Sequence, residues 1–320
     1  METLQGGWLK RRRDLRGFFP APDPRRPTNH SIFAMHLWQI LILAVVQGAC
    51  ELLPVSSSAH VIVAEKIMGI DPTTPEMTLL LVALHTGTMF AVLTYFWRAW
   101  CAELFASTTS FWNFVKQLVV ATAATGVIGL VLLFLIEKVA LRGHDNAEVE
   151  SLFGNMTLIA CALAAVGILI ILSSRLANRE REGQWPGTRE SGWIGAIQGL
   201  CLPFRGFSRS GATISTALFL GLSRLRAEQF SFALAVILTP PVIAREFARL
   251  LKAHALAADG TSANLAHLLL PAAIGMVASF FAGLLALKWL SQWLERGRWA
   301  LFGYYCLFAA VAVFLLQFWL

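Results

Sequence analysis

Long runs of apolar residues alternate with short polar stretches along most of the chain. Six runs have about the 20 residues that a helix needs to cross the hydrocarbon core of a bilayer. They predict membrane spans at roughly 78–97, 115–136, 153–174, 228–250, 268–287 and 299–319. Two pairs of shorter apolar runs flank Ser-rich turns, one pair at 35–53 and 61–69 and the other at 193–203 and 212–222. The pattern therefore predicts an all-α polytopic membrane protein.

The shorter runs predict two re-entrant hairpins. Pro54 ends the first run of one pair, and the polar stretch FRGFSRSG interrupts the other. Such irregular backbone is tolerated inside a bilayer only where it lines a cavity of the protein, so each pair should enter and leave the membrane on one side.

The two halves of the chain resemble each other. QGACELLPVSSSAH begins at Gln47, and QGLCLPFRGFSRSGAT begins at Gln198. Each half would hold one hairpin and three spans, and an odd number of crossings turns the second half upside down. We therefore expect an inverted-topology repeat, with the first repeat at about 35–174 and the second at about 192–320 of a single membrane domain, 35–320.

Composition and charge agree with a membrane location. Of the 320 residues, 57% are hydrophobic and 14% are charged, whereas soluble domains carry about 25% charged residues. The chain has no P-loop, no Rossmann glycine motif and no HExxH, and we expect membrane lipid rather than nucleic acid as its surroundings. Basic loops at 175–190 and 288–298 predict cytoplasmic placement, which puts both chain ends outside.

The first 34 residues contain seven Lys and Arg side chains against three acidic ones. They predict a basic, disordered N-terminal extension, with a partner-binding arm as the alternative. A basic segment outside conflicts with the positive-inside rule, and the conflict disappears if Met35 is the true start.

The first Ser-rich turn combines a carboxylate, three hydroxyls and an imidazole. Gln47 and Glu51 are four residues apart and share one helix face. Glu51 would serve as an acid or base, one serine of Ser56–Ser58 as a nucleophile, and His60 as an acid, base or phosphate donor. The structural alternatives are an ion pair of Glu51 with Arg209, helix capping by the serines and a buried structural histidine. His85, inside a predicted span, is assigned to packing, with a place at the border of the cavity as the alternative.

The second turn brings a guanidinium to the same depth. Arg209 has the planar fork that binds phosphate bidentately, and Ser208 and Ser210 supply hydroxyls at a helix start. A buried guanidinium needs an anionic partner, and we expect Glu51 and a bound diphosphate to be its partners.

Taken together, LPVSSSAH, GFSRSGATIS, FSFALAV at 230–236 and GYY at 303–305 resemble the undecaprenyl-diphosphatase family of bacterial bacitracin-resistance phosphatases. The resemblance covers about Met35 to the C-terminus. It implies hydrolysis of undecaprenyl diphosphate to undecaprenyl phosphate and phosphate, which recycles the carrier lipid for cell-wall synthesis. It also implies a bacterial cytoplasmic-membrane location, a site open to the periplasm, a divalent cation (Mg²⁺ or Ca²⁺) and a homodimer.

The resemblance also assigns site residues. The family's acidic pair falls on Gln47 and Glu51, and the glutamine leaves Glu51 as the metal ligand. The other positions that match the family's motifs are Ser56, Ser57, His60, Ser208, Arg209, Ser210 and Thr213. The chain departs from the family at Arg205, where proline is usual, and at Cys306, where arginine usually follows the tyrosine pair.

A reaction hypothesis follows from these assignments. Ser57 attacks the terminal phosphorus, His60 or Glu51 handles its proton, and Arg209 stabilises the charge, whereas direct attack by water is the rival chemistry. The diphosphate-binding set is expected to comprise Gln47, Ser56, Ser58, Ser208, Ser210, Gly211 and Thr213. A polyprenyl-phosphate flippase or transporter is the alternative function, because inverted repeats are common in transporters. A type-2 phosphatidic acid phosphatase lacks support, because its His-Asp partner is missing.

Overall fold

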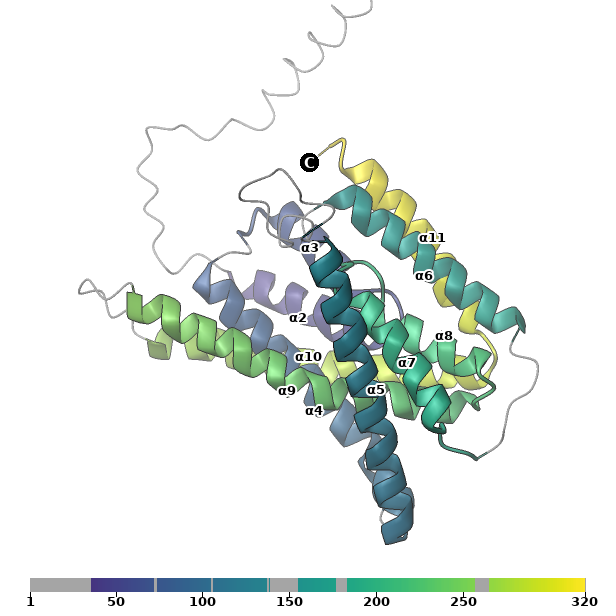
Figure 1. The fold of residues 1–320 in the computed structure, drawn as a ribbon. Helices are drawn as coiled ribbons and strands as arrows, with labels where there is room; N and C mark the ends of the chain where they lie inside the picture. The colour runs from purple at the N-terminus through teal and green to yellow at the C-terminus, as the bar shows by residue number, and fades with distance from the viewer. Residues whose placement is uncertain are drawn as a thin grey trace, which may run out of the picture. The chain divides into compact units, whose positions relative to one another are not determined.

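The computed structural model describes residues 36–71, 74–104, 106–136, 138, 155–176, 183–256 and 265–319. Over these ranges the chain forms ten α-helices and no β-strand (Figure 1). Six helices are long and apolar enough to cross a membrane, over Met77–Leu104, Thr108–Leu135, Met156–Leu176, Arg224–Arg245, Leu269–Glu295 and Trp299–Leu316. The prediction of an all-α, multi-pass membrane protein is confirmed. The predicted N-terminal extension, 1–34, lies outside the described residues.

The described helices follow the order of the apolar runs. They are α2 (Leu37–Leu52), α3 (Ser57–Met68), α4 (Pro75–Leu104), α5 (Thr108–Leu135), α6 (Met156–Leu176), α7 (Thr188–Cys201), α8 (Arg209–Phe219), α9 (Arg224–Leu256), α10 (Leu265–Glu295) and α11 (Trp299–Leu316). Helix α5 starts earlier than the predicted residue 115. Ser107 caps it by accepting a 3.1 Å hydrogen bond from the backbone N–H of Ser110, so the polar first turn is helical as well.

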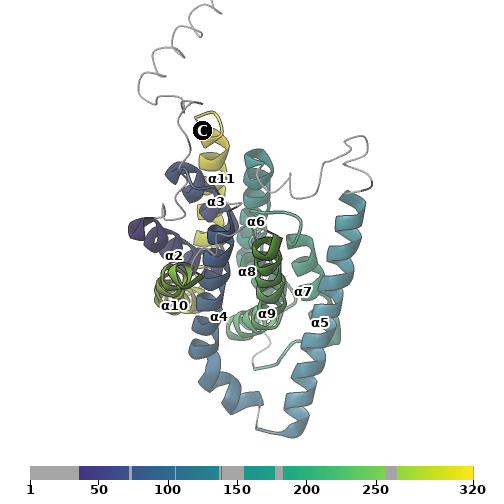
Figure 2. The ribbon, with the colours of Figure 1, turned by 90° about the vertical axis from the view of Figure 1, so that its left-hand side faces the viewer.

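Helices from distant parts of the chain pack in pairs. α6 lies beside α11, α2 lies against α10, and α7 lies against α5 (Figures 1 and 2). Gly167 of α6 and Gly303 of α11 face each other so closely that a Cβ on Gly167 would stand 2.9 Å from the carbonyl oxygen of Gly303. Small residues at such crossings let the backbones approach, as is common in membrane helix packing.

One apolar core holds the segments that connect the short helices. Leu53 and Val55, which follow α2, belong to the same buried cluster as Ala212 and Ile214 of α8. The aromatic rings of α4 and α9 join it, and Phe96 stacks on Phe232 with ring centroids 5.7 Å apart. The two short-helix pairs are therefore fixed against a common interior.

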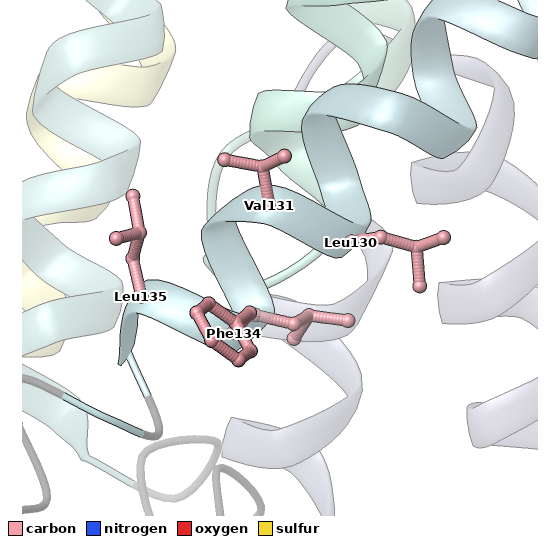
Figure 3. A pocket seen from close by; sticks show the side chains of 5 residues that line it. Leu130, Val131, Phe134 and Leu135 are labelled. Atoms are coloured by element: carbon pink, nitrogen blue, oxygen red, sulfur yellow. The ribbon is translucent and has the colours of Figure 1, made fainter.

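An open hollow of about 690 Å³ lies on α5, with Leu130, Val131, Phe134 and Leu135 around it (Figure 3). Its lining is almost wholly hydrocarbon. Such a surface suits contact with lipid chains and offers no group for acid–base or phosphate chemistry. The polar residues predicted from the sequence gather elsewhere, at the ends of the short helices.

Candidate active site

The first bend joins α2 to α3 through residues 53–56. Pro54 cannot donate a backbone hydrogen bond, so the helix stops before it. Ser56 has φ +68° and ψ 97°, and among the described residues it is the one non-glycine residue with positive φ. A non-glycine residue in this region costs about 1–3 kcal/mol and persists only where its surroundings hold it. Ser56 precedes α3 without a side-chain capping bond, so its hydroxyl is not used as a cap.

The second bend joins α7 to α8 through residues 202–208. Gly206 has φ +100°, and a Cβ there would stand 2.6 Å from the carbonyl oxygen of Ile159 on α6. Only glycine suits both conditions. Ser208 caps α8 by accepting a 3.2 Å hydrogen bond from the N–H of Gly211, so capping explains this serine.

Hydrogen bonds join the two bends directly. The hydroxyl of Ser210 donates to the carbonyl oxygen of Leu53 at 3.2 Å. The N–H of Gly206 donates to the hydroxyl of Ser58 at 3.4 Å. The predicted meeting of the two turns is therefore present in the structure.

Glu51 is the centre of the polar cluster. The hydroxyl of Ser57 donates to its Oε2 at 2.5 Å, and Nε2 of Gln47 donates to the same oxygen at 3.2 Å. On the other side, Nη2 of Arg209 donates to Oε1 at 3.4 Å. The guanidinium favours the ionised carboxylate, and that carboxylate is in position to accept the proton of Ser57.

Arg209 is held from a second direction as well. Its Nη1 donates to the carbonyl oxygen of Ser231 on α9 at 3.4 Å. The hydroxyl of Ser231 lies 2.6 Å from that of Thr213, which also donates to the carbonyl of Arg209. The side chains of Arg209 and Glu51 remain 22% and 21% exposed, so the pair is partly accessible to a ligand.

His60, in the first turn of α3, contacts the backbone of the bend and a side chain of α11. Its Nδ1 is 2.7 Å from the carbonyl oxygen of Ser56, and its Nε2 is 2.7 Å from the hydroxyl of Tyr305 on α11. Both ring nitrogens thus have partners other than Ser57. Of the two bases proposed from the sequence, the one that contacts the Ser57 hydroxyl is Glu51.

His85 is a member of the cluster that the sequence assigned to packing. Its Nε2 stands 3.9 Å from Oε2 of Glu51, and its Nδ1 is 2.8 Å from the carbonyl oxygen of Leu81. A histidine inside an apolar span was the available signal. Ser231 and Tyr305 lie in the FSFALAV and GYY segments that carry the family resemblance, but a serine and a tyrosine are ordinary residues in membrane helices and neither was assigned a site role.

Fold and cluster together define a multi-pass membrane protein in which a hydroxyl, a carboxylate and a guanidinium meet between two interrupted helix pairs. The family model described as "Bacitracin resistance protein BacA" matches residues 40–312. The chain belongs to this family.

Curated relatives agree along nearly their whole length. Undecaprenyl-diphosphatase 2 of Acinetobacter baylyi is 60% identical over 276 residues, which cover 86% of this chain and 95% of the relative. Undecaprenyl-diphosphatase 2 of Burkholderia thailandensis is 34% identical over 293 residues, with 87% and 95% covered. Undecaprenyl-diphosphatase 2 of Burkholderia orbicola is 33% identical over 294 residues, with the same coverage.

Proposed function

We propose that the chain is an integral membrane undecaprenyl-diphosphatase, which releases phosphate from undecaprenyl diphosphate and returns undecaprenyl phosphate to cell-wall synthesis. In this role it confers resistance to bacitracin, as its family's description indicates. The observation that carries the proposal is the Ser57–Glu51–Arg209 arrangement, in which nucleophile, base and anion-binding group meet within hydrogen-bonding distance. The relatives' printed names support the lipid substrate.

The geometry supports a covalent route. As the oxygen of Ser57 bonds to the terminal phosphorus, its proton passes to Glu51 and the bond to undecaprenyl phosphate breaks. Arg209 stabilises the charge on the transferring phosphoryl group. Water then attacks the phosphoserine and the phosphorus–serine bond breaks, the proton held by Glu51 returns to the oxygen of Ser57, and both protons of the water leave with the inorganic phosphate. The products are undecaprenyl phosphate and inorganic phosphate.

Trapping the intermediate tests this route against direct attack by water. Undecaprenyl diphosphate labelled at the terminal phosphorus should leave label on Ser57 after a rapid acid quench, and Ser57→Ala should lose both label and turnover. The matched control is Ser110→Ala. Ser110 lies at the start of α5, where its hydroxyl contacts that of Ser107 and not the polar cluster, so this variant should behave as wild type. Near-normal turnover of Ser57→Ala would rule out the covalent route and leave water activated by Glu51.

The proposal includes a divalent cation, Mg²⁺ or Ca²⁺. Among the described residues no three His, Cys, Asp or Glu side chains are grouped for metal binding. A cation that takes one or two carboxylates from the protein and its other ligands from phosphate, as Mg²⁺ commonly does, does not need a group of three such side chains. Glu51 would hold it, with the amide of Gln47 beside it, and the cation would neutralise charge on the diphosphate. Mn²⁺ titrated in the presence of pyrophosphate should give a bound electron paramagnetic resonance signal that Glu51→Gln weakens.

The inverted repeat is also part of the proposal, and matched glycine contacts support it. A Cβ on Gly283 of α10 would meet Leu52 at 3.0 Å and the oxygen of Gly48 at 3.7 Å. A Cβ on Gly129 of α5 would meet Leu202 at 2.6 Å and the oxygen of Gly199 at 3.7 Å. The Gln-Gly pair of the first half thus packs against α10, the second span of the second half, and the Gln-Gly pair of the second half packs against α5, the second span of the first half. Two halves related by a pseudo-two-fold axis make such reciprocal contacts.

The lengths of the short helices support re-entrant hairpins. At about 1.5 Å per residue, α2 is about 24 Å long and α8 about 16 Å, both short of the roughly 30 Å core of a bilayer. The proposal places the first hairpin on the periplasmic side of the cytoplasmic membrane and the second on the cytoplasmic side. It has the diphosphate enter from the periplasm. The homodimer stays a prediction of the family resemblance.

A further inference from the structure

Helix α11 reaches the first bend through two neighbouring side chains. The Tyr305 hydroxyl lies 2.7 Å from Nε2 of His60, and the two rings are stacked, with centroids 5.7 Å apart and planes inclined by 14°. The thiol of Cys306 contacts the carbonyl oxygen of Pro54 at 3.3 Å. The last span of the chain is therefore bonded to the segment that presents Ser57.

The partners of His60 define its protonation. A carbonyl oxygen can only accept a hydrogen bond, so Nδ1, 2.7 Å from the oxygen of Ser56, must carry the hydrogen. In the neutral ring Nε2 is then an acceptor, and the hydroxyl of Tyr305 donates to it. The Ser56 carbonyl therefore sets the tautomer, and the Tyr305 hydroxyl, as the donor to Nε2, fixes the orientation of the imidazole.

The carbonyl that His60 holds belongs to the strained residue. Ser56 keeps φ +68°, and the next residue is Ser57, whose hydroxyl is 2.5 Å from Glu51. Rotation of the Ser56 backbone toward ordinary φ values would redirect the start of α3 and move that hydroxyl. A hydrogen bond to the Ser56 carbonyl opposes this rotation.

We propose that Tyr305 is a positioning residue for phosphoryl transfer, which acts through His60 to hold the Ser56 backbone in the conformation that aims Ser57 at Glu51. The inference rests on the proposed function, in which Ser57 is the nucleophile. In this proposal His60 stabilises the backbone conformation of Ser56, and Glu51 accepts the proton of Ser57.

Tyr305→Phe removes the hydroxyl and keeps the stacked ring. We expect kcat for phosphate release to fall about threefold to tenfold, the range given by loss of one neutral hydrogen bond, with KM within about twofold. The matched control is Tyr304→Phe, whose hydroxyl accepts from Arg175 at 3.1 Å away from the bend, and which should keep wild-type kcat. An unchanged kcat in Tyr305→Phe, or a change confined to KM, would overturn the proposal.

A double-mutant cycle tests the route through His60. In a His60→Ala background, Tyr305→Phe should change kcat by less than about 1.5-fold, because the group through which it acts is gone. If Tyr305→Phe lowers kcat there as much as in wild type, Tyr305 acts by another route and the proposal is wrong.

A second measurement does not depend on activity. In protein labelled with ¹⁵N-histidine, His60 should show a protonated Nδ1 and a hydrogen-bonded, unprotonated Nε2, and Tyr305→Phe should shift the Nε2 resonance. An unshifted resonance would overturn the contact even if His60→Ala fails to fold. If Tyr305→Phe shifts the Nε2 resonance as expected but Ser57→Ala stays active, the proposed nucleophile is wrong, whereas the contact of Tyr305 with His60 is confirmed.

Discussion

Arg209 holds its position through two different contacts, one with Glu51 and one with the backbone oxygen of Ser231. A planar guanidinium reaches both at once because its nitrogens point in fixed, divergent directions. A lysine ammonium is a single point charge on a flexible stem. It can keep the charge of this position but not both contacts.

We therefore expect Arg209→Lys to lower kcat by about 10²-fold, the usual cost of losing one preorganised donor at a developing negative charge. The measurement is phosphate release from undecaprenyl diphosphate in detergent. Arg224→Lys, which alters a contact with the backbone of Glu295 outside the cluster, should retain wild-type kcat. Equal activity of Arg209→Lys and wild type would mean that charge alone suffices.

At this scale the sequence predicted which residues meet but not how they pair. Glu51, Ser57 and Arg209 were foreseeable because buried ionisable groups require partners and only a few are present. The pairing of His60 with Tyr305, and the approach of His85 to Glu51, depend on how far α11 and α4 are rotated about their axes. Apolar periodicity is weak in spans that are hydrophobic all round, so it does not define that rotation.

Helix α3 carries Glu65, whose burial disfavours the charged form of its carboxyl group. Glu65 is buried, and no group in the described part of the chain hydrogen-bonds to its Oε1. Burial raises the pKa of Glu65 to about 7, and the nearby charge of Arg205 offsets part of that rise. The unfolded chain releases this proton at the ordinary pKa, near 4.5.

Between pH 4.5 and 7 the unfolded chain thus loses a proton that the folded chain keeps, so the stability contributed by this group falls as pH rises. We expect the wild-type Tm in detergent to decline from pH 5 to pH 7, and Glu65→Gln to flatten that decline. Thermal unfolding at pH 5, 6, 7 and 8 measures the effect. Parallel Tm profiles for the two proteins would contradict it.

Helix α2 depends on a glycine for its contact with α10. A Cβ on Gly48 would stand 2.6 Å from the carbonyl oxygen of Ser279 and 2.7 Å from the Cβ of Ala282. We expect Gly48→Ala to destabilise the fold by about 1–3 kcal/mol and to lower activity, since an overpacked contact displaces the helix that carries Glu51. Tm and phosphate release measure both effects.

The control for this substitution is Gly192→Ala on α7, where an added Cβ would meet no atom of the described residues within 4 Å. It should leave activity unchanged and raise stability slightly, by about 0.5–1 kcal/mol, because alanine is the better helix former. If Gly48→Ala and Gly192→Ala had the same Tm, the α2–α10 contact would not be tight.

The existence and order of the helices were readable from the sequence, because runs of this length and hydropathy have few other solutions. The residues at which the helices begin and end were harder to predict from the sequence. The start of α5 was predicted seven residues too late, since a polar first turn capped by Ser107 looks like a loop when only hydropathy is considered. Contacts such as α2 with α10 follow from which glycines face one another, and this is visible only in the assembled protein.

For the whole molecule, the proposed inverted repeat makes a prediction about sidedness. In a variant without the five native cysteines, single cysteines at His36 and Ile70 flank the first hairpin, and those at Gln184 and Ser223 flank the second. An impermeant thiol reagent applied to intact spheroplasts should label the first pair, and the second pair only after permeabilisation. Labelling of His36→Cys and Ile70→Cys from opposite faces would show that α2 and α3 form one broken span instead of a hairpin.

The bonds between the two bends also bear on how the protein is made. Arg209 follows Glu51 by 158 residues, which at about 5–20 residues per second is on the order of 10 to 30 s of translation. Throughout that interval the nascent chain carries the acid of its first hairpin without the guanidinium that neutralises it. The contacts that the first bend makes with Arg209, Ser210 and Gly206 can form only after the second half has been synthesised, so the first hairpin reaches its final structure late in the synthesis of the chain.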